Sequence, residues 1–210
     1  MLENLPEALG HALRDQRAGL DKTAFQAVDL RAGMARISVQ SLAFADHAPI
    51  PERYTADGEG VSPPLHWSGV PAGVGSVLLI VEDADAPTPQ PLVHAIVVDL
   101  PGEDGALAEG ALPSSDHDGS GLHTGRNSFL QASWLPPDPP PGHGVHRYVF
   151  QVFALAAGAV FDGTPGREAV LEALREHGVA SGCHIGTYER PDTSIRADQP
   201  AAVMTPPTAG

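Results

Sequence analysis

The chain has 210 residues, of which 42% are hydrophobic and 18% charged, a composition in the ordinary range for a globular protein with one sizeable core. Its 26 acidic residues outnumber 12 basic ones, and the net charge of -14 disfavours binding to nucleic-acid backbones or anionic lipid surfaces. An anionic ligand must therefore be held locally, by histidine side chains and backbone N–H groups.

The cysteine content and the apolar segments narrow the protein class further. Cys183 is the one cysteine, so neither an intrachain disulfide nor a cysteine-rich zinc module is expected. Residues 1–4 lack a basic segment followed by an apolar run, and no uninterrupted apolar stretch reaches the ~18 residues of a membrane span. We therefore expect a cytoplasmic protein without integral membrane association.

The first predicted element is an amphipathic helix over residues 5–18. Leu5, Leu9 and Leu13 recur at helical spacing before a glycine stop signal. Because this helix precedes the first strand pattern, we interpret residues 1–35 as an N-terminal helical extension. It has three alternative roles, which are docking on the core, self-association into a homodimer and loose attachment; we favour docking.

The following segments have the patterns of strands. Apolar and polar residues alternate over residues 37–44. Residues 77–81 and 95–100 are continuous, β-branched apolar runs bounded by proline or glycine, which is typical of strands buried on both faces. Residues 148–154 form another strong strand pattern. The domain is therefore predicted to be predominantly β.

One internal helix and two long loops complete the predicted elements. The helix spans residues 164–177, with Thr164 as N-cap and Pro165 in the first helical position. Residues 101–127 and 133–144 contain few apolar anchors and much glycine, proline, serine and aspartate. Loops of such length inside a compact domain are usually functional or mobile.

The pattern fits one folded domain, over residues 36–190. Residues 191–210 are rich in alanine, proline and threonine, and we expect them to form a flexible C-terminal tail. We find no internal repeat and no second domain.

Polar residues stand at the ends of the most apolar strands, where a rigid backbone can aim them into a shared cleft. Asp83 and Asp85 directly follow the first continuous apolar run. His94 directly precedes the second run, and His146 opens the third strand pattern. Taken singly, the carboxylates are interpreted as turn caps and the histidines as hydrogen-bonded structural residues.

Together, these two carboxylates and two histidines allow two kinds of site. Both residue types are metal ligands, but no HExxH, HxH or cysteine-containing spacing supports a metal centre. In the alternative, the carboxylates raise the histidine pKa values, and the resulting imidazolium N–H groups hold an anion.

Five segments resemble motifs of the phosphatidylethanolamine-binding protein family. Residues 54–67 resemble Y-T-x-D-G-x-x-x-S-P-P-L-x-W, and residues 83–87 resemble D-P-D-A-P with alanine replacing the first proline. Residues 125–127 are similar to G-x-N, and residues 137–148 to P-x-P-P-x-G-x-G-x-H-R-Y. Residues 186–190 resemble the G-x-Y-x-R ending of the bacterial Raf-kinase-inhibitor-like branch. Five motifs in the right order make the resemblance specific.

The resemblance covers residues 37–190 and implies a mainly β fold. That fold is an antiparallel β-sandwich of a large and a small sheet with a few peripheral helices. It also implies a ligand pocket, in which we expect no catalytic residues, cofactor or metal. The implied ligand-binding residues are Asp83, Asp85, His94, Pro137, Pro139, His146 and Tyr148, with Asn127 and Arg147 in supporting positions.

Three residues depart from the family pattern near this pocket. Ala95 stands where many members have tryptophan, and Trp134 stands where tyrosine is common. Pro136 replaces a usual glycine. We expect a wider pocket at Ala95 and a stiffer loop at Pro136, because a proline restricts the residue that precedes it.

These observations favour a binding protein over an enzyme. Ser62 lies in a proline-locked segment, and Cys183 and His184 are neighbours without an evident orienting acid, so no activated nucleophile is visible. We expect a small anionic ligand of the phosphate or phosphoethanolamine type. The alternative is an enzyme in which the Asp/His cluster binds a metal or acts as acid and base on a small phosphorylated or acyl substrate.

A further alternative is a regulatory inhibitor of a kinase or protease. In that interpretation, the pocket rim and the loop over residues 114–125 contact the partner. The family includes such proteins, but no residue of this chain identifies the partner.

Overall fold

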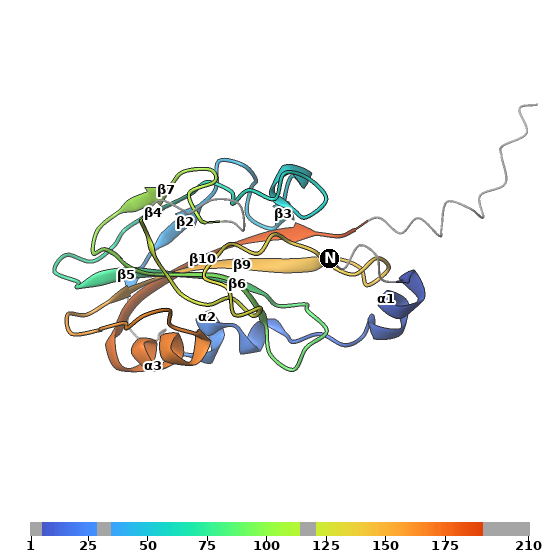
Figure 1. The fold of residues 1–210 in the computed structure, drawn as a ribbon. Coiled ribbons are helices and arrows are strands. Elements are labelled where there is room, and N and C mark those ends of the chain that lie inside the picture. Colours follow the sequence, from blue (N-terminus) through green and yellow to red (C-terminus); the bar gives the residue numbers. More distant parts are fainter. Residues whose placement is uncertain (1–5, 29–34, 114–120, 191–210) are drawn as a thin grey trace, which may run out of the picture.

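Four long strands form the centre of the larger of two sheets in the computed structural model, which describes residues 6–28, 35–113 and 121–190 (Figure 1). They follow one another in the order β10, β9, β5, β6, and each neighbouring pair is antiparallel. Their bounds are Ser76–Asp83 for β5, Leu92–Pro101 for β6, His146–Leu155 for β9 and Gly178–Tyr188 for β10. Three of them contain the predicted apolar runs.

Short strands extend the larger sheet at both edges. β1 (Ala35–Arg36) and β3 (Ala48–Pro49) pair with β10 in parallel, and β8 (His123–Thr124) pairs with β6 in antiparallel orientation. Within the described residues, this sheet therefore has seven strands. The predicted antiparallel sandwich is confirmed, and the parallel pairings are confined to two-residue additions.

The smaller sheet covers one face of the larger one. It consists of β2 (Ser38–Gln40), β4 (Leu65–Ser68) and β7 (Gly105–Leu107) in that spatial order. The core between the sheets includes Val39, Trp67, Leu79, Phe150 and Val152. Gly182 on β10 lets the layers approach, because a Cβ there would lie 2.0 Å from the Ile37 backbone oxygen.

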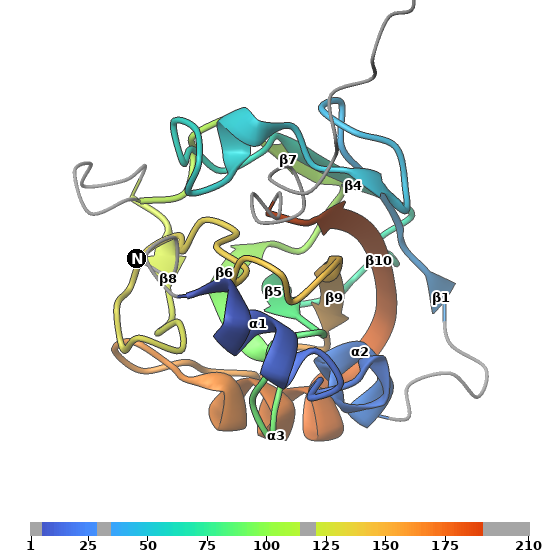
Figure 2. The ribbon, with the colours of Figure 1, turned by 90° about the vertical axis from the view of Figure 1, so that its right-hand side faces the viewer.

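Helices cover the opposite face of the larger sheet (Figure 2). They are α2 (Ala24–Ala27) and α3 (Arg167–His177). The core on this side includes Leu78, Ile80, Phe153, Leu171 and Leu174. Successive residues of β5 therefore enter opposite cores, which explains why its sequence is continuously apolar. Two short 3-10 helices, η2 (Leu20–Lys22) and η3 (Glu52–Tyr54), lie in connecting segments.

The structure corrects the start of the internal helix. α3 begins at Arg167 with Gly166 as its N-cap, so Thr164 and Pro165 are not its first residues. The backbone oxygen of Pro165 accepts a hydrogen bond of 2.8 Å from the backbone N–H of Arg126. This contact holds the residues before the helix against the loop that follows β8, and the helix starts after it.

The N-terminal helix is also shorter than predicted. α1 spans Glu7–Leu13, and its buried residue is Gly10, while Leu9 is 41% exposed. It lies at one end of the larger sheet and not on its face (Figures 1 and 2). No helix in the described ranges is long and apolar enough to cross a membrane. The predicted tail, residues 191–210, lies outside the described residues.

A buried ionic network attaches α2 and α3 to the larger sheet. Glu82 on β5 has 0% exposure and accepts hydrogen bonds from the Arg167 side chain at 2.6 Å and the Ala24 backbone at 2.7 Å. The Gln151 side chain donates a third bond of 2.9 Å. A buried carboxylate is tolerated because each of these donors satisfies it.

Replacing the cation of this network should unfold the protein more easily. We expect Arg167→Met to lower the free energy of unfolding by about 3–5 kcal/mol, because Glu82 remains buried and loses its counter-ion. Urea unfolding provides the measurement. Arg175→Met, an exposed position of α3, is the matched control, and adding Glu82→Gln should restore much of the loss. Equal losses in the two single variants would contradict this role for Arg167.

Candidate functional site

The antiparallel register brings the predicted polar residues to one end of the larger sheet. Asp83, the last residue of β5, lies opposite Tyr148 on β9 and Leu92 on β6. His94 is close to the start of β6, and His146 is the first residue of β9. Side chains that are 63 positions apart, such as Asp83 and His146, can therefore form a hydrogen bond.

A cavity of about 150 Å³ lies at this end of the sheet. Its polar lining consists of Asp83, His94, Asp138 and His146. Its apolar lining consists of Ala86, Pro87, Leu92, Phe129, Leu135, Pro136, Pro139 and Pro140. The volume is below the roughly 300–1,000 Å³ of pockets for drug-sized ligands, so the cavity fits only a small group.

Asp83 begins a chain of buried hydrogen bonds along the cavity wall. Its carboxylate lies 2.7 Å from His146 Nδ1, and His146 Nε2 lies 2.6 Å from Nδ1 of His143. His143 Nε2 lies 2.9 Å from the backbone oxygen of Leu13. Both ring nitrogens of His146 therefore have partners within the protein, and neither is open to a ligand in this arrangement.

His94 differs from His146 because one of its ring nitrogens has no hydrogen-bond partner among the described residues. Its ring is buried, with 3% exposure, and its Nδ1 lies 2.6 Å from the backbone oxygen of Leu135. A carbonyl only accepts, so Nδ1 carries the hydrogen and Nε2 of the neutral ring has a free lone pair. Burial lowers the pKa of His94, although the Asp83 carboxylate opposes this effect. The carboxylate therefore acts in the expected direction, but desolvation outweighs it, and the net pKa of His94 is lowered.

Tyr148 lies against both histidines but is not among the residues that line the cavity. Its ring meets His94 edge-on at 5.1 Å and stacks with His146 at 6.4 Å between centroids. The side chain has 0% exposure, and within the described part of the chain neither its hydroxyl nor His94 Nε2 has a hydrogen-bond partner. Burial raises the pKa of Tyr148 well above its usual value, so the hydroxyl keeps its proton.

Asp85 does not line the cavity. Its carboxylate accepts two hydrogen bonds of 2.6 Å from the Arg147 guanidinium and lies 3.1 Å from Arg17. Burial raises the pKa of Asp85, but the bonds from Arg147 and Arg17 outweigh burial and leave the pKa below its usual value. Asp85 and Arg147 therefore fix the loop after β5 and do not face the ligand space.

Of the other predicted residues, one lines the cavity and two hold the loops around it. Pro139 lines the cavity, whereas Pro137 does not, and its backbone oxygen accepts a bond of 2.9 Å from Ala56. The Asn127 side chain accepts bonds from the Phe129 and Gln131 backbones and shapes the loop that carries Phe129 to the cavity. These placements do not test ligand binding, so the binding roles stay predictions.

Three polar residues in or next to the site were missed from the sequence. Asp138 lies in the quoted proline-rich motif, and its carboxylate is 2.7 Å from the Arg190 guanidinium. Asp57, the aspartate of the Y-T-x-D-G motif, also binds Arg190, at 2.8 Å. His143 occupies a variable motif position, and only its contact with His146 reveals its place in the site.

A family model described as phosphatidylethanolamine-binding protein matches residues 40–189. The chain belongs to the phosphatidylethanolamine-binding protein (PEBP) family. It is 38% identical over 156 residues to a UPF0098 protein of Methanothermobacter thermautotrophicus, covering 73% of this chain and 99% of that protein.

Two solved structures show the same fold. The putative PEBP homologue CT736 of Chlamydia trachomatis has 34% identity and a TM-score of 0.65 over 76% of this chain and 99% of its own. YbcL of E. coli, described as a new member of the mammalian PEBP family, has 28% identity and a TM-score of 0.66 over 73% and 98%.

The departures from the PEBP pattern affect this pocket unequally. Ala95 is buried in the core between the sheets and is not among the cavity-lining residues, so the expected widening at this position is not seen in the cavity lining. Trp134 packs on His94, with ring centroids 6.1 Å apart, and on Phe150. Pro136 lines the cavity directly.

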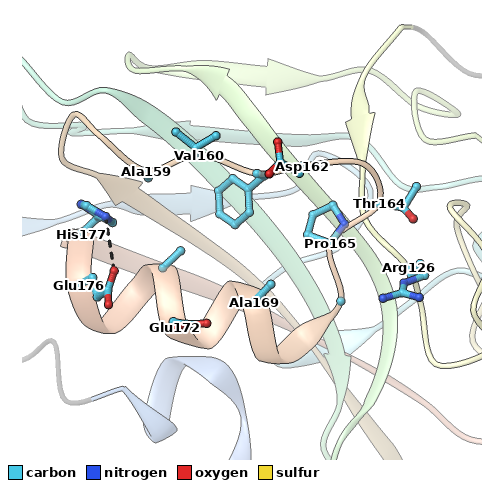
Figure 3. Close-up of a pocket in the computed structure, with 13 residues that line it drawn as sticks. Arg126, Ala159, Val160, Asp162, Thr164, Pro165, Ala169, Glu172, Glu176 and His177 are labelled. Carbon is cyan, nitrogen blue, oxygen red and sulfur yellow. Dashed lines mark ion pairs between the residues drawn. The ribbon is translucent and has the colours of Figure 1, made fainter.

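A larger hollow of about 410 Å³ lies beside α3, between that helix and residues 159–166 (Figure 3). Its charged groups are at the surface, where His177 lies 3.8 Å from Glu176, and Arg126 is exposed. No predicted site residue lines it. The described residues also contain no group of three or more metal-ligating side chains arranged to hold an ion. We therefore take the cavity beside His94 as the candidate site.

The buried neutral state of His94 predicts a specific loss of stability in acid. The unfolded chain takes up a proton at this histidine below the ordinary pKa of 6.5, whereas the folded chain does so only at lower pH. As pH falls through that window, the free energy of unfolding should decrease by up to about 1.4 kcal/mol per pH unit from this residue.

Urea unfolding at several pH values checks this prediction. His94→Gln keeps an amide donor for Leu135 but cannot titrate, so its stability should depend less on pH than that of the wild type. His66→Gln on the smaller sheet is the matched control. A variant slope equal to that of the wild type would show that His94 is not the responsible group.

Proposed function

We propose that the cavity binds the anionic head group of a small ligand, of the phosphate or phosphoethanolamine type. The observation that supports this proposal is that two buried polar atoms, His94 Nε2 and the Tyr148 hydroxyl, have no hydrogen-bond partner among the described residues. Such atoms are costly to bury unsatisfied and commonly mark a place for water or a ligand. His94 lines the cavity and Tyr148 packs against its ring, while eight of the other lining residues are apolar.

The protonation states of these two groups determine which ligand they accept. The Tyr148 hydroxyl is a donor to an anionic oxygen. Neutral His94 Nε2 accepts a hydrogen bond and becomes a donor only when the ring gains a proton. A hydrogen phosphate supplies both an acceptor oxygen and a P–OH donor, whereas a fully ionised anion requires that His94 take up a proton.

The remaining polar lining favours a ligand that also has a cationic group. Asp83 and Asp138 line the same cavity, and their carboxylates oppose a purely anionic ligand. An ammonium group beside the phosphate compensates for this repulsion. We therefore propose that phosphoethanolamine binds more tightly than inorganic phosphate, with Phe129, which is 50% exposed, at the apolar rim.

We also propose that this site binds its ligand without chemical conversion. Asp85 is neutralised by two guanidinium groups, and both ring nitrogens of His146 already have protein partners. Neither residue is therefore available as a base, and the free lone pair of His94 Nε2 has no hydroxyl, thiol or amine nucleophile among the described residues that line the cavity. Inhibition of a kinase or protease remains a prediction, because residues 114–120 of the expected partner loop lie outside the described residues.

Calorimetric titration with phosphoethanolamine and inorganic phosphate tests the proposal. We expect affinity for both to weaken as pH rises, by at most about tenfold per pH unit for one proton taken up at His94. Tyr148→Phe removes the donor and should weaken binding by about tenfold or more. Titrations in two buffers with different ionisation enthalpies measure the proton uptake.

Two histidine variants distinguish binding at this site from a general effect of charge on the pH dependence of affinity. His94→Gln should remove most of the pH dependence, whereas His66→Gln should leave it unchanged. Binding that strengthens with rising pH, or that is equal in wild type, Tyr148→Phe and His94→Gln, would refute this pocket as the anion site.

A further inference from the structure

The N-terminal segment packs on both loops that form the pocket, although it precedes the residues that match the family model. The backbone N–H groups of Ala18 and Gly19 donate to the backbone oxygens of Ala86 and Ala84, at 3.0 and 2.7 Å. The Arg17 guanidinium donates to the backbone oxygens of His143 and Val145, at 3.0 and 2.7 Å. The segment therefore joins the loop after β5 to the loop before β9.

Helix α1 makes the closest approach to the second loop, at the sheet end seen in Figure 2. A Cβ atom at Gly10 would lie 1.9 Å from the backbone oxygen of Pro141, so only glycine permits this contact. One turn later, the Leu13 backbone oxygen lies 2.9 Å from His143 Nε2. The position of α1 thus determines whether His143 has this acceptor.

Three hydrogen bonds connect the Leu13 carbonyl to the Asp83 carboxylate through His143 and His146. They determine how many hydrogens this hydrogen-bonded series contains. The Leu13 carbonyl only accepts, so His143 Nε2 carries a hydrogen. The short contact between His143 and His146 requires a second hydrogen, and the contact between His146 and Asp83 requires a third. Two neutral histidines and an ionised aspartate supply two hydrogens, so the intact chain contains one more.

We propose that His143 and the Leu13 carbonyl are positioning groups, which orient His146 and keep this additional proton between His143 and Asp83. The N-terminal segment would then set the charge of the pocket wall. With the additional proton, the two histidines and the carboxylate are neutral in sum; without it they carry one negative charge. This inference goes beyond the proposed function and is tested without a ligand.

The surroundings indicate where the proton resides. Burial and the neighbouring His146 lower the pKa of His143. His146 lies between His143 and the Asp83 carboxylate and can donate from both ring nitrogens, so we place the additional hydrogen on His146, next to the carboxylate. Among the described residues, the other charged or titratable groups near these rings include Arg17, His94, Asp138 and Tyr148.

Displacing α1 removes the constraint. Without the backbone acceptors of this segment, Leu13 and Gln16, His143 can carry its hydrogen on Nδ1 and donate it to His146 Nε2. His146 then donates only to Asp83, and the chain is complete with two hydrogens. The pocket wall becomes more negative, and His146 becomes a neutral imidazole.

Imidazole nitrogen NMR shifts of the full-length, ligand-free protein at neutral pH test this inference. In the wild type, both His146 ring nitrogens should show the protonated signature. Gly10→Ala, which forces α1 away from Pro141, should convert more than about half of His146 to the neutral form. Leu9→Ala, on the exposed side of the same helix, is the control and should keep the wild-type signature.

Two substitutions of His143 separate proton retention from packing. The amide of His143→Gln can accept from His146 and donate to Leu13, so this variant should preserve the imidazolium signature. His143→Leu provides no acceptor and should lose it. A neutral His146 in the wild type, or an imidazolium that persists in Gly10→Ala and His143→Leu alike, would overturn the proposal. If His143→Leu fails to fold, the comparison of Gly10→Ala with Leu9→Ala still tests the proposal.

Discussion

The buried hydrogen bond between Asp83 and His146, 2.7 Å long, is the contact on which the organisation of the site depends. It joins the end of β5 to the start of β9 within the central pair of the larger sheet. A carboxylate in this position needs a donor, because an unpaired buried charge costs several kcal/mol. The same requirement extends outward from His146 to His143 and the Leu13 carbonyl, so the charge at the strand end orders the loop before β9.

The molecule satisfies its buried charges internally and leaves neutral polar atoms open. Glu82, Asp83 and Asp85 all occur within one short stretch, yet each has its own cationic or imidazole partner from a distant segment. By contrast, His94 Nε2 and the Tyr148 hydroxyl have no partner in the described structure. In a protein of net charge -14, these neutral groups add no further negative charge at the cavity.

Both ends of the described chain hold the proline-rich loop over residues 136–146. Arg17 and Leu13 contact its second half through His143 and Val145. Near the other terminus, Arg190 donates to the Pro139 backbone oxygen at 2.9 Å and pairs with Asp138. A loop without regular hydrogen bonds gains its fixed shape from these side-chain contacts, and three of its prolines and their neighbours can then form a stable cavity wall.

The strands β5, β6 and β9 could be predicted from the sequence because their contacts with the core on both faces require continuous hydrophobic residues. β10 was not predicted, since its glycines weaken the strand pattern. Those glycines are explained by tertiary contacts, as a Cβ at Gly186 would lie 2.4 Å from the Ile50 side chain. The true start of α3 likewise depends on the contact between Pro165 and Arg126, which local capping patterns do not contain.

For the site, the sequence by itself determined which residue types stand at the strand ends and, through the ordered motifs, which family they belong to. Only the tertiary structure decided their separate roles. It turned Asp85 toward Arg147 and Arg17, placed His143 behind His146, and left His94 neutral and open to the cavity. The physical reason is that hydrogen-bond partners and desolvation depend on distant segments packed together in space, and no spacing within one motif records them.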